Sequence, residues 1–148
     1  MGAPLSLNNK EVIQVYKSDF MDALKTLEFS WRKLKDQKIP DLNQKYLDAL
    51  ESWEALTSRF ARTTDIFLTK YIRFLILELD PGFRGEIRDY LDKAEKANLI
   101  SNADTWMKIR ELRNQVAHEY TKADLEKTFK DVVSLTPFVL KDLERHKS

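Results

Sequence analysis

The stretch that decides the fold is residues 60–77, FARTTDIFLTKYIRFLIL, in which apolar side chains recur without a glycine or a proline. It continues an apolar stripe at helical spacing, and it becomes apolar on nearly every side over residues 74–77 before Asp-Pro-Gly at 80–82 interrupts it. We therefore expect one long helix from Tyr46 to this break, buried on more than one side. The stripe consists of Tyr46, Leu50, Trp53, Leu56, Phe60, Phe67, Tyr71 and Phe74.

Comparable stripes lie on both sides of this segment. A first long helix is expected to end near residues 39–40, and a short third helix is expected around residues 87–94. Ser-Asn-Ala-Asp at 101–104 and Thr-Lys-Ala-Asp at 121–124 have the pattern of capping boxes that open a fourth and a fifth helix. Pro137 is expected to kink the fifth helix or to end its first part. The predicted fold is all-α, an up-and-down bundle of four long helices with one short helix inserted, in a single domain over residues 1–148.

Composition narrows the classes of function. The chain has 148 residues with three glycines, four prolines and 33% charged residues, which favours helices over a turn-rich sheet protein. The absence of cysteine excludes disulfides, thiol catalysis and thiolate metal sites. No known metal, nucleotide or serine-hydrolase motif occurs, so no cofactor and no metal is expected. Without an apolar run of membrane-spanning length or a signal-peptide pattern, a soluble cytoplasmic protein is expected, with no membrane partner.

The chemistry concentrates in residues 113–120, Arg-Asn-Gln-Val-Ala-His-Glu-Tyr. His118 is the first candidate for acid–base catalysis near neutral pH, because the other histidine, His146, lies near the end of the chain, where chains usually fray. At about 100° per residue, Arg113 sits at the edge of the arc that should face the core, and His118 is about 140° away from it. One helix would therefore not aim both side chains at one atom, whereas two helices related by a twofold axis would. The core arc consists of Trp106, Ile109, Leu112, Val116 and Tyr120, and the other flank carries Met107, Arg110, Asn114 and His118.

These residues resemble a known family. Arg113, four residues, His118, one residue and Tyr120 are similar to the arginine-x4-histidine-x-tyrosine motif of HEPN domain proteins, in particular the HepT-like toxins, and Asn114 follows the arginine as is common there. The similarity covers most of the chain, including residues 60–62, residues 98–100, Trp106 and residues 110–114.

The resemblance implies a homodimeric, metal-independent endoribonuclease of a toxin–antitoxin system, with the motifs of both subunits meeting in a cleft. It implies that His118 supplies acid and base for attack of the 2′-hydroxyl on RNA and that Arg113 stabilises the transition state. Asn114 would orient His118 or contact the phosphate. The cognate partner would be a nucleotidyltransferase antitoxin that modifies Tyr120 with AMP.

Other interpretations of the same residues remain open. The chain could be a non-catalytic HEPN partner subunit of a nucleotidyltransferase, or a structural helical adaptor. His118 could be a histidine favoured by the dipole at a helix C-terminus, and Tyr120 could be a buried aromatic with its hydroxyl at the surface. Arg113 could form a structural ion pair with Asp19 or Asp65, alongside catalysis or without it.

A basic stripe on the second helix is a further candidate for binding. Arg59, Arg62, Lys70 and Arg73 fall within about 80° of one another on the second helix. A solvated charged face is the simplest interpretation. Docking of RNA or of an acidic protein partner is the alternative, and Arg110 on the fourth helix is a candidate for the same role.

Overall fold

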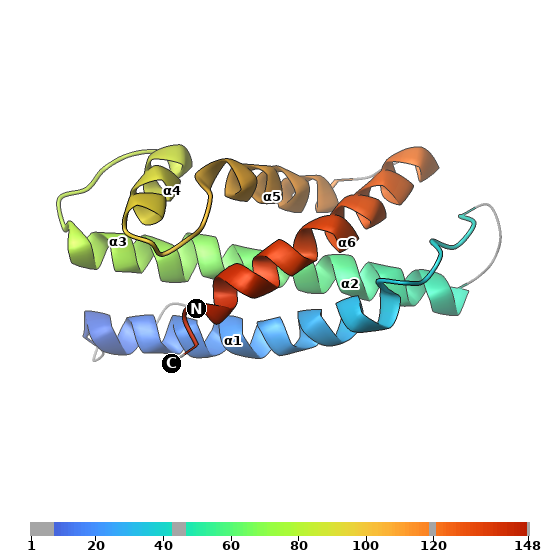
Figure 1. Cartoon of the computed structure of the whole chain (residues 1–148), viewed down its shortest axis with the longest axis horizontal. Coiled ribbons are helices and arrows are strands. Elements are labelled where there is room, and N and C mark those ends of the chain that lie inside the picture. Colours follow the sequence, from blue (N-terminus) through green and yellow to red (C-terminus); the bar gives the residue numbers. More distant parts are fainter. Residues whose placement is uncertain (1–7, 43–46, 119–120, 148) are drawn as a thin grey trace.

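The computed structural model describes residues 8–42, 47–118 and 121–147, and these residues form helices without a strand (Figure 1). The prediction of an all-α protein is confirmed. Successive long helices run in opposite directions, and the last one crosses the others obliquely (Figure 1). None of the helices in the described part of the chain is long and apolar enough to cross a membrane. The elements are α1 (Asn9–Leu34), α2 (Leu47–Asp65), the π-helical segment η1 (Ile66–Ile72), α3 (Arg73–Leu79), α4 (Ile87–Lys96), α5 (Ala103–Val116) and α6 (Lys122–Glu144).

The first helix ends earlier than predicted. Its last residue is Leu34, not a residue near 39–40, and Lys35 closes it with a hydrogen bond to the carbonyl of Trp31. Leu34 is also the last buried residue of the stripe, because the next positions on that face are polar. Helices are stabilised mainly by packing of their apolar face, so the helix stops where that face stops.

The long second helix is one continuous rod, but its middle is not an α-helix. Residues 66–72 adopt the wider π-helical geometry between α2 and α3. A π segment changes the angular register that a regular α-helix would keep. Its buried side chains come in adjacent pairs, Phe67 with Leu68 and Tyr71 with Ile72, so the π segment is buried over a broad face. The burial on more than one side that was predicted from residues 74–77 is less complete there, because Ile76 is buried and the other three residues are half-buried.

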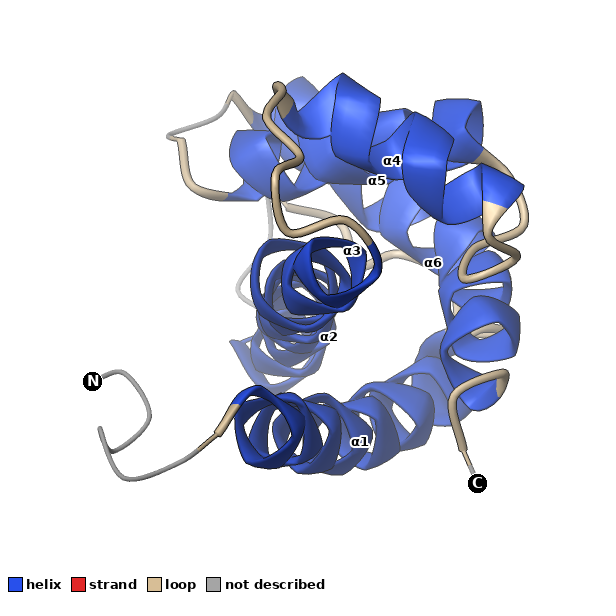
Figure 2. Cartoon of the chain, turned by 90° about the vertical axis from the view of Figure 1, so that its left-hand side faces the viewer, coloured by secondary structure: helices blue, strands red, loops and turns tan. Residues whose placement is uncertain are grey.

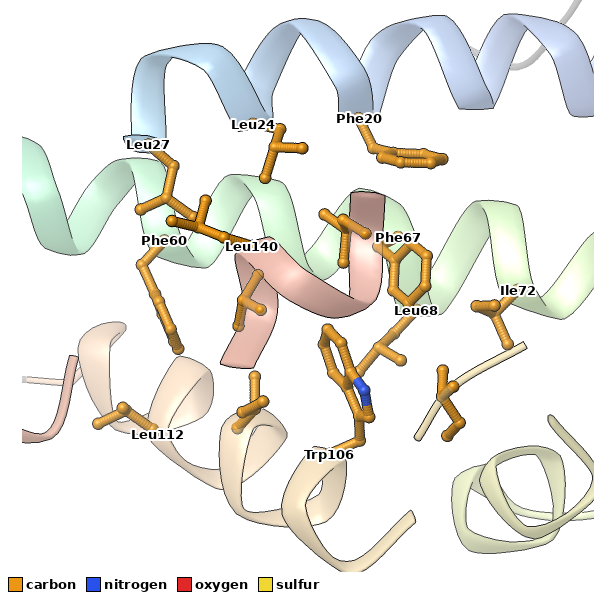
Figure 3. Packing of buried hydrophobic residues seen from close by; sticks show 14 of the residues in the cluster. Phe20, Leu24, Leu27, Phe60, Phe67, Leu68, Ile72, Trp106, Leu112 and Leu140 are labelled. Carbon is orange, nitrogen blue, oxygen red and sulfur yellow. The ribbon is translucent and has the colours of Figure 1, made fainter. Parts of the chain in front are cut away.

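Neighbouring helices cover this rod from several directions (Figures 1 and 2). α1 packs along α2 and η1, α5 packs on α2 and α4, and α6 contacts α1, α2 and α5. Aromatic rings join these helices at the centre: Phe67 lies 5.3 Å from Phe20 of α1 and 5.1 Å from Trp106 of α5, measured between ring centroids (Figure 3). Such edge and tilted ring contacts add to the burial of apolar area.

A buried carboxylate fixes the start of α5 to the end of α6. Asp142 is almost fully buried, accepts hydrogen bonds from Trp106 Nε1 at 2.7 Å and from the backbone N–H of Ser101 at 3.0 Å, and lies 3.2 Å from Arg145 Nε. The residue that caps α5 is Asn102, whose side chain accepts from the N–H of Thr105, so the predicted box at 101–104 is offset by one residue. These contacts hold the helix that carries the motif.

The opening of α6 agrees with its predicted capping signal, since the Thr121 side chain accepts from the N–H of Asp124. Pro137 does not end the helix, which continues through it to Glu144.

Candidate active site

The predicted arginine of the motif is paired across the fold. Arg113 Nε lies 3.2 Å from Asp65 Oδ1, and Nη2 donates to Oδ2 at 3.3 Å. Asp65 is the last residue of α2, directly before the π segment. The ion-pair interpretation with Asp65 is therefore confirmed, whereas Asp19 is not a partner of Arg113 among the described contacts.

This pairing leaves the guanidinium only partly satisfied. Arg113 Nε is buried and makes no hydrogen bond with any described residue, because its contact with Asp65 Oδ1 has the distance of an ion pair without the alignment of a hydrogen bond. The side chain as a whole is 33% exposed. Because a guanidinium carries five N–H donors, one carboxylate on one edge leaves donors available to a second anion.

Two adjoining pockets lie beside this arginine, between η1 and the helices α4 and α5. The narrower pocket, of about 60 Å³, contains Asp65, Arg113 and Asn114, and the wider one, of about 220 Å³, contains Arg73 and Tyr90. We call the two together the arginine groove. Leu68, Thr69 and Arg110 line both pockets; Thr64 completes the narrower one, and Gly85 and Ile87 the wider one.

The charges of the groove favour an anion. Arg73, Arg110 and Arg113 contribute three positive charges, and Asp65 is the one carboxylate among the lining residues. The predicted supporting residue Asn114 is exposed and adds an amide at the rim. Phosphate and carboxylate groups are the ligands that such arginine forks bind best.

The structure does not bring His118 into this groove. α5 ends at Val116, and the backbone N–H groups of Ala117 and His118 bond three residues back, to Asn114 and Gln115. The prediction that His118 lies on the same helix flank as Asn114 is therefore wrong, and the angle of about 140° does not apply. The imidazole is exposed just beyond the C-terminus of α5. The tighter last turn explains the early end, because bonds three residues back do not continue an α-helix.

Glu119 and Tyr120 lie outside the described residues, so the proposed modification site at Tyr120 has no structural description. Val116 is half-buried, and Trp106, Ile109 and Leu112 are buried as the predicted core arc requires.

The basic residues of the second helix do not form one uniform face. Arg59 donates to Ser30 Oγ at 2.7 Å and to the carbonyl of Thr26, which ties α2 to α1. Lys70 lies over the ring of Tyr16 of α1, whereas Arg73 lies over the ring of Tyr90 of α4. The π segment separates Arg59 from Arg73, so arithmetic based on a regular α-helix does not hold between them. Arg62 is exposed on α2.

The other histidine, His146, is held by contacts within the fold, although a fraying chain end was expected there. His146 Nε2 lies 2.7 Å from the carbonyl oxygen of Leu99, and Nδ1 lies 3.1 Å from the hydroxyl of Tyr71. The carbonyl can only accept, so Nε2 carries the proton and Nδ1 accepts from the tyrosine. Burial lowers the pKa of His146 below its ordinary value, and burial raises the pKa of Tyr71. The spacing of the sequence could have indicated this role, because His146 follows the apolar Leu143 by three residues, as neighbours on one helix face do.

No model of a known protein family matches the chain, and no curated protein sequence matches it either. Among the residues that the structure describes, no group of three or more histidine, cysteine, aspartate or glutamate side chains is placed to hold a metal ion.

Proposed function

We propose that the protein is a metal-independent endoribonuclease of the HEPN type, acting as the toxin of a toxin–antitoxin pair. The observation that carries this proposal is the arginine groove, in which one helix supplies Arg110, Arg113 and Asn114. A phosphodiester offers the charge and the acceptor oxygens that these donors require. The motif of residues 113–120 supplies the reason to choose RNA cleavage over simple anion binding.

The proposed reaction is attack of a ribose 2′-hydroxyl on the adjacent phosphorus. A base removes the 2′-proton, the bond from phosphorus to the 5′-oxygen breaks, and an acid protonates that oxygen, leaving a 2′,3′-cyclic phosphate and a 5′-hydroxyl. Arg113 would stabilise the charge that develops on the phosphoryl oxygens, and His118 would serve as acid and base.

The position of His118 supports a site shared between two copies. The residues that line the groove of one copy include no histidine. His118 is exposed beyond the end of α5 and is accessible to a second molecule. In the proposed homodimer, each groove holds the phosphate through Arg113, and the imidazoles come together at the interface.

The same observation favours a second function. A groove that binds phosphate without an acid–base group of its own suits a non-catalytic subunit that holds a substrate for a separate nucleotidyltransferase. In that case Arg113 binds, and the loss of His118 has no effect on binding.

Incubation of purified protein with RNA in excess chelator distinguishes the two. We expect cleavage that leaves cyclic phosphate ends and that is lost in Arg113→Ala and His118→Ala but retained in Arg88→Ala, whose exposed side chain pairs with Asp92 and Asp104. Cleavage that survives either motif substitution contradicts the ribonuclease proposal. RNA binding without cleavage supports the second function.

Expression in cells with and without a candidate nucleotidyltransferase partner tests the toxin assignment. We expect growth arrest from the wild-type protein alone and relief by the partner, together with an AMP adduct on Tyr120 in the intact mass. Growth arrest that persists in Arg113→Ala contradicts a toxin acting through this groove.

A further inference from the structure

The wider pocket of the arginine groove differs in chemistry from the narrower one. Its walls include the aliphatic side chains of Leu68 and Ile87 and the ring of Tyr90, with Arg73 and Arg110 beside them. Leu68 is buried, whereas Ile87 and Tyr90 are half-buried. Apolar and aromatic walls with planar cations at the rim suit a flat, polar-edged ring better than they suit a bare phosphate.

Contacts behind Tyr90 hold its ring in place. The ring of Phe83 lies 4.8 Å away and almost perpendicular, at 88°. Lys93 in turn lies 4.9 Å from the Phe83 ring and 2.9 Å from Asp80. A ring that is already ordered loses little entropy when a ligand stacks on it.

Arg73 approaches the same ring, with its Cζ 5.8 Å from the centroid of Tyr90. A guanidinium plane stacks on bases, and its N–H groups match the acceptors on a base edge. The pocket thus offers two planar groups from different helices, one aromatic and one cationic.

The two pockets adjoin each other through shared lining residues. Arg110, Leu68 and Thr69 line both, so a phosphate at Arg113 and Arg110 has the wider pocket as its immediate neighbour. The π segment supplies Leu68 and Thr69 to this junction. π-helical turns within α-helices often occur at functional sites.

We propose that the wider pocket binds one nucleobase of a single-stranded RNA, the base adjacent to the phosphate held by Arg113. The inference rests on the proposed function for the identity of the polymer. A base in a duplex is stacked and paired, so only an unpaired base enters. The pocket therefore restricts cleavage to loops, bulges and single strands.

Binding of a 5′-labelled single-stranded oligoribonucleotide to the His118→Ala protein tests this, since that variant is expected not to cut its ligand. We expect Tyr90→Leu to raise the dissociation constant about tenfold, because stacking on one aromatic side chain has an effect of this size. Tyr90→Phe retains the ring and should bind like the parent protein. Arg73→Gln should weaken binding several-fold and provides a second variant if Tyr90→Leu does not fold.

Tyr16→Leu is the matched control, because Tyr16 is a half-buried tyrosine with a neighbouring cation, Lys70, on the α1 side of the rod. Equal affinities for Tyr90→Leu and Tyr16→Leu, or a defect of the same size on duplex RNA, would overturn the proposal. So would the absence of any RNA binding. If RNA is bound through Tyr90 but the wild-type protein does not cut it, the nucleobase pocket stands and the ribonuclease proposal fails. If the wild-type protein cuts RNA and Tyr90→Leu cuts it equally well, the ribonuclease proposal stands and the nucleobase pocket fails.

Discussion

The indole Nε1–H of Trp31 donates to the backbone carbonyl of Val133 at 3.1 Å, across 102 positions of sequence. In an α-helix this carbonyl would accept from the N–H of residue 137, which is a proline here and has no N–H to give. Trp31 of α1 therefore satisfies the acceptor that Pro137 leaves unpaired in α6. This contact explains how the helix continues through the proline.

A double-mutant cycle measures this compensation. Trp31→Phe removes the donor and should lower the free energy of unfolding by about 1–3 kcal/mol, the cost of an unpaired, partly buried polar group together with some lost packing. In a Pro137→Ala background the helix supplies its own donor, so the same substitution should cost about 1 kcal/mol less. Urea unfolding of the four proteins gives the coupling energy, and additive effects of the two substitutions would show that the bond is not compensatory.

The buried carboxylate of Asp142 should be one of the most sensitive positions in the chain. Asp142→Ala leaves the indole N–H of Trp106 and the N–H of Ser101 without their acceptor, and we expect a loss of about 3 kcal/mol. Asp131→Ala is the control, because Asp131 pairs with the exposed Lys127 one turn away, a contact that contributes little. Chemical denaturation of both variants tests this, and equal losses would refute the assigned role.

Much of the fold follows from apolar periodicity, and so does one contact of the candidate site. Arg113 lies at the edge of a core-facing arc, where an ion pair with Asp19 or Asp65 was one interpretation, and Asp65 is the partner. The π segment was not predictable in this way, because its geometry comes from packing on several helices at once. The support that Trp31 gives to Pro137 was missed for a similar reason, since it depends on residues far apart in sequence. The end of α5 before His118 depends on local hydrogen bonds that a helical wheel does not represent.

Asp65 should affect the groove more than the stability of the fold. The pair with Arg113 is about one-third to two-fifths exposed, so Asp65→Asn should change the free energy of unfolding by less than about 1 kcal/mol. Removing the carboxylate takes away the competitor for the guanidinium and its orienting partner. We expect tighter RNA binding and slower cleavage, measured as KM and kcat separately. Asp92→Asn, which breaks the exposed pair with Arg88, should change neither constant.

Arg110 and Arg62 provide a matched test of the groove's charge. Arg110→Ser should weaken RNA binding and reduce the slope of log affinity against log salt by about 0.7, the value for one phosphate contact on a single strand. Arg62 lies on α2 and does not line either pocket of the groove. Arg62→Ser should therefore leave the slope unchanged. Equal reductions in the two variants would contradict binding in the groove and would indicate a binding surface on α2.

His146 should make stability depend on pH. Its pKa is lower in the folded protein than in the unfolded chain, because burial opposes the charged form more than the Leu99 carbonyl and Asp142 favour it. The unfolded chain therefore binds more protons between the two pKa values, and stability falls as the pH drops through about 6.5 toward the folded-state pKa. His146→Phe should remove this dependence, since phenylalanine does not titrate and can pack among Phe20, Phe67 and Tyr71. His118→Ala should retain it, because this substitution leaves His146 and its contacts with Leu99 and Tyr71 in place. Unfolding free energies measured at pH 7.5 and 5.5 test this. A pH dependence that is lost in His118→Ala but retained in His146→Phe would contradict the role assigned to His146.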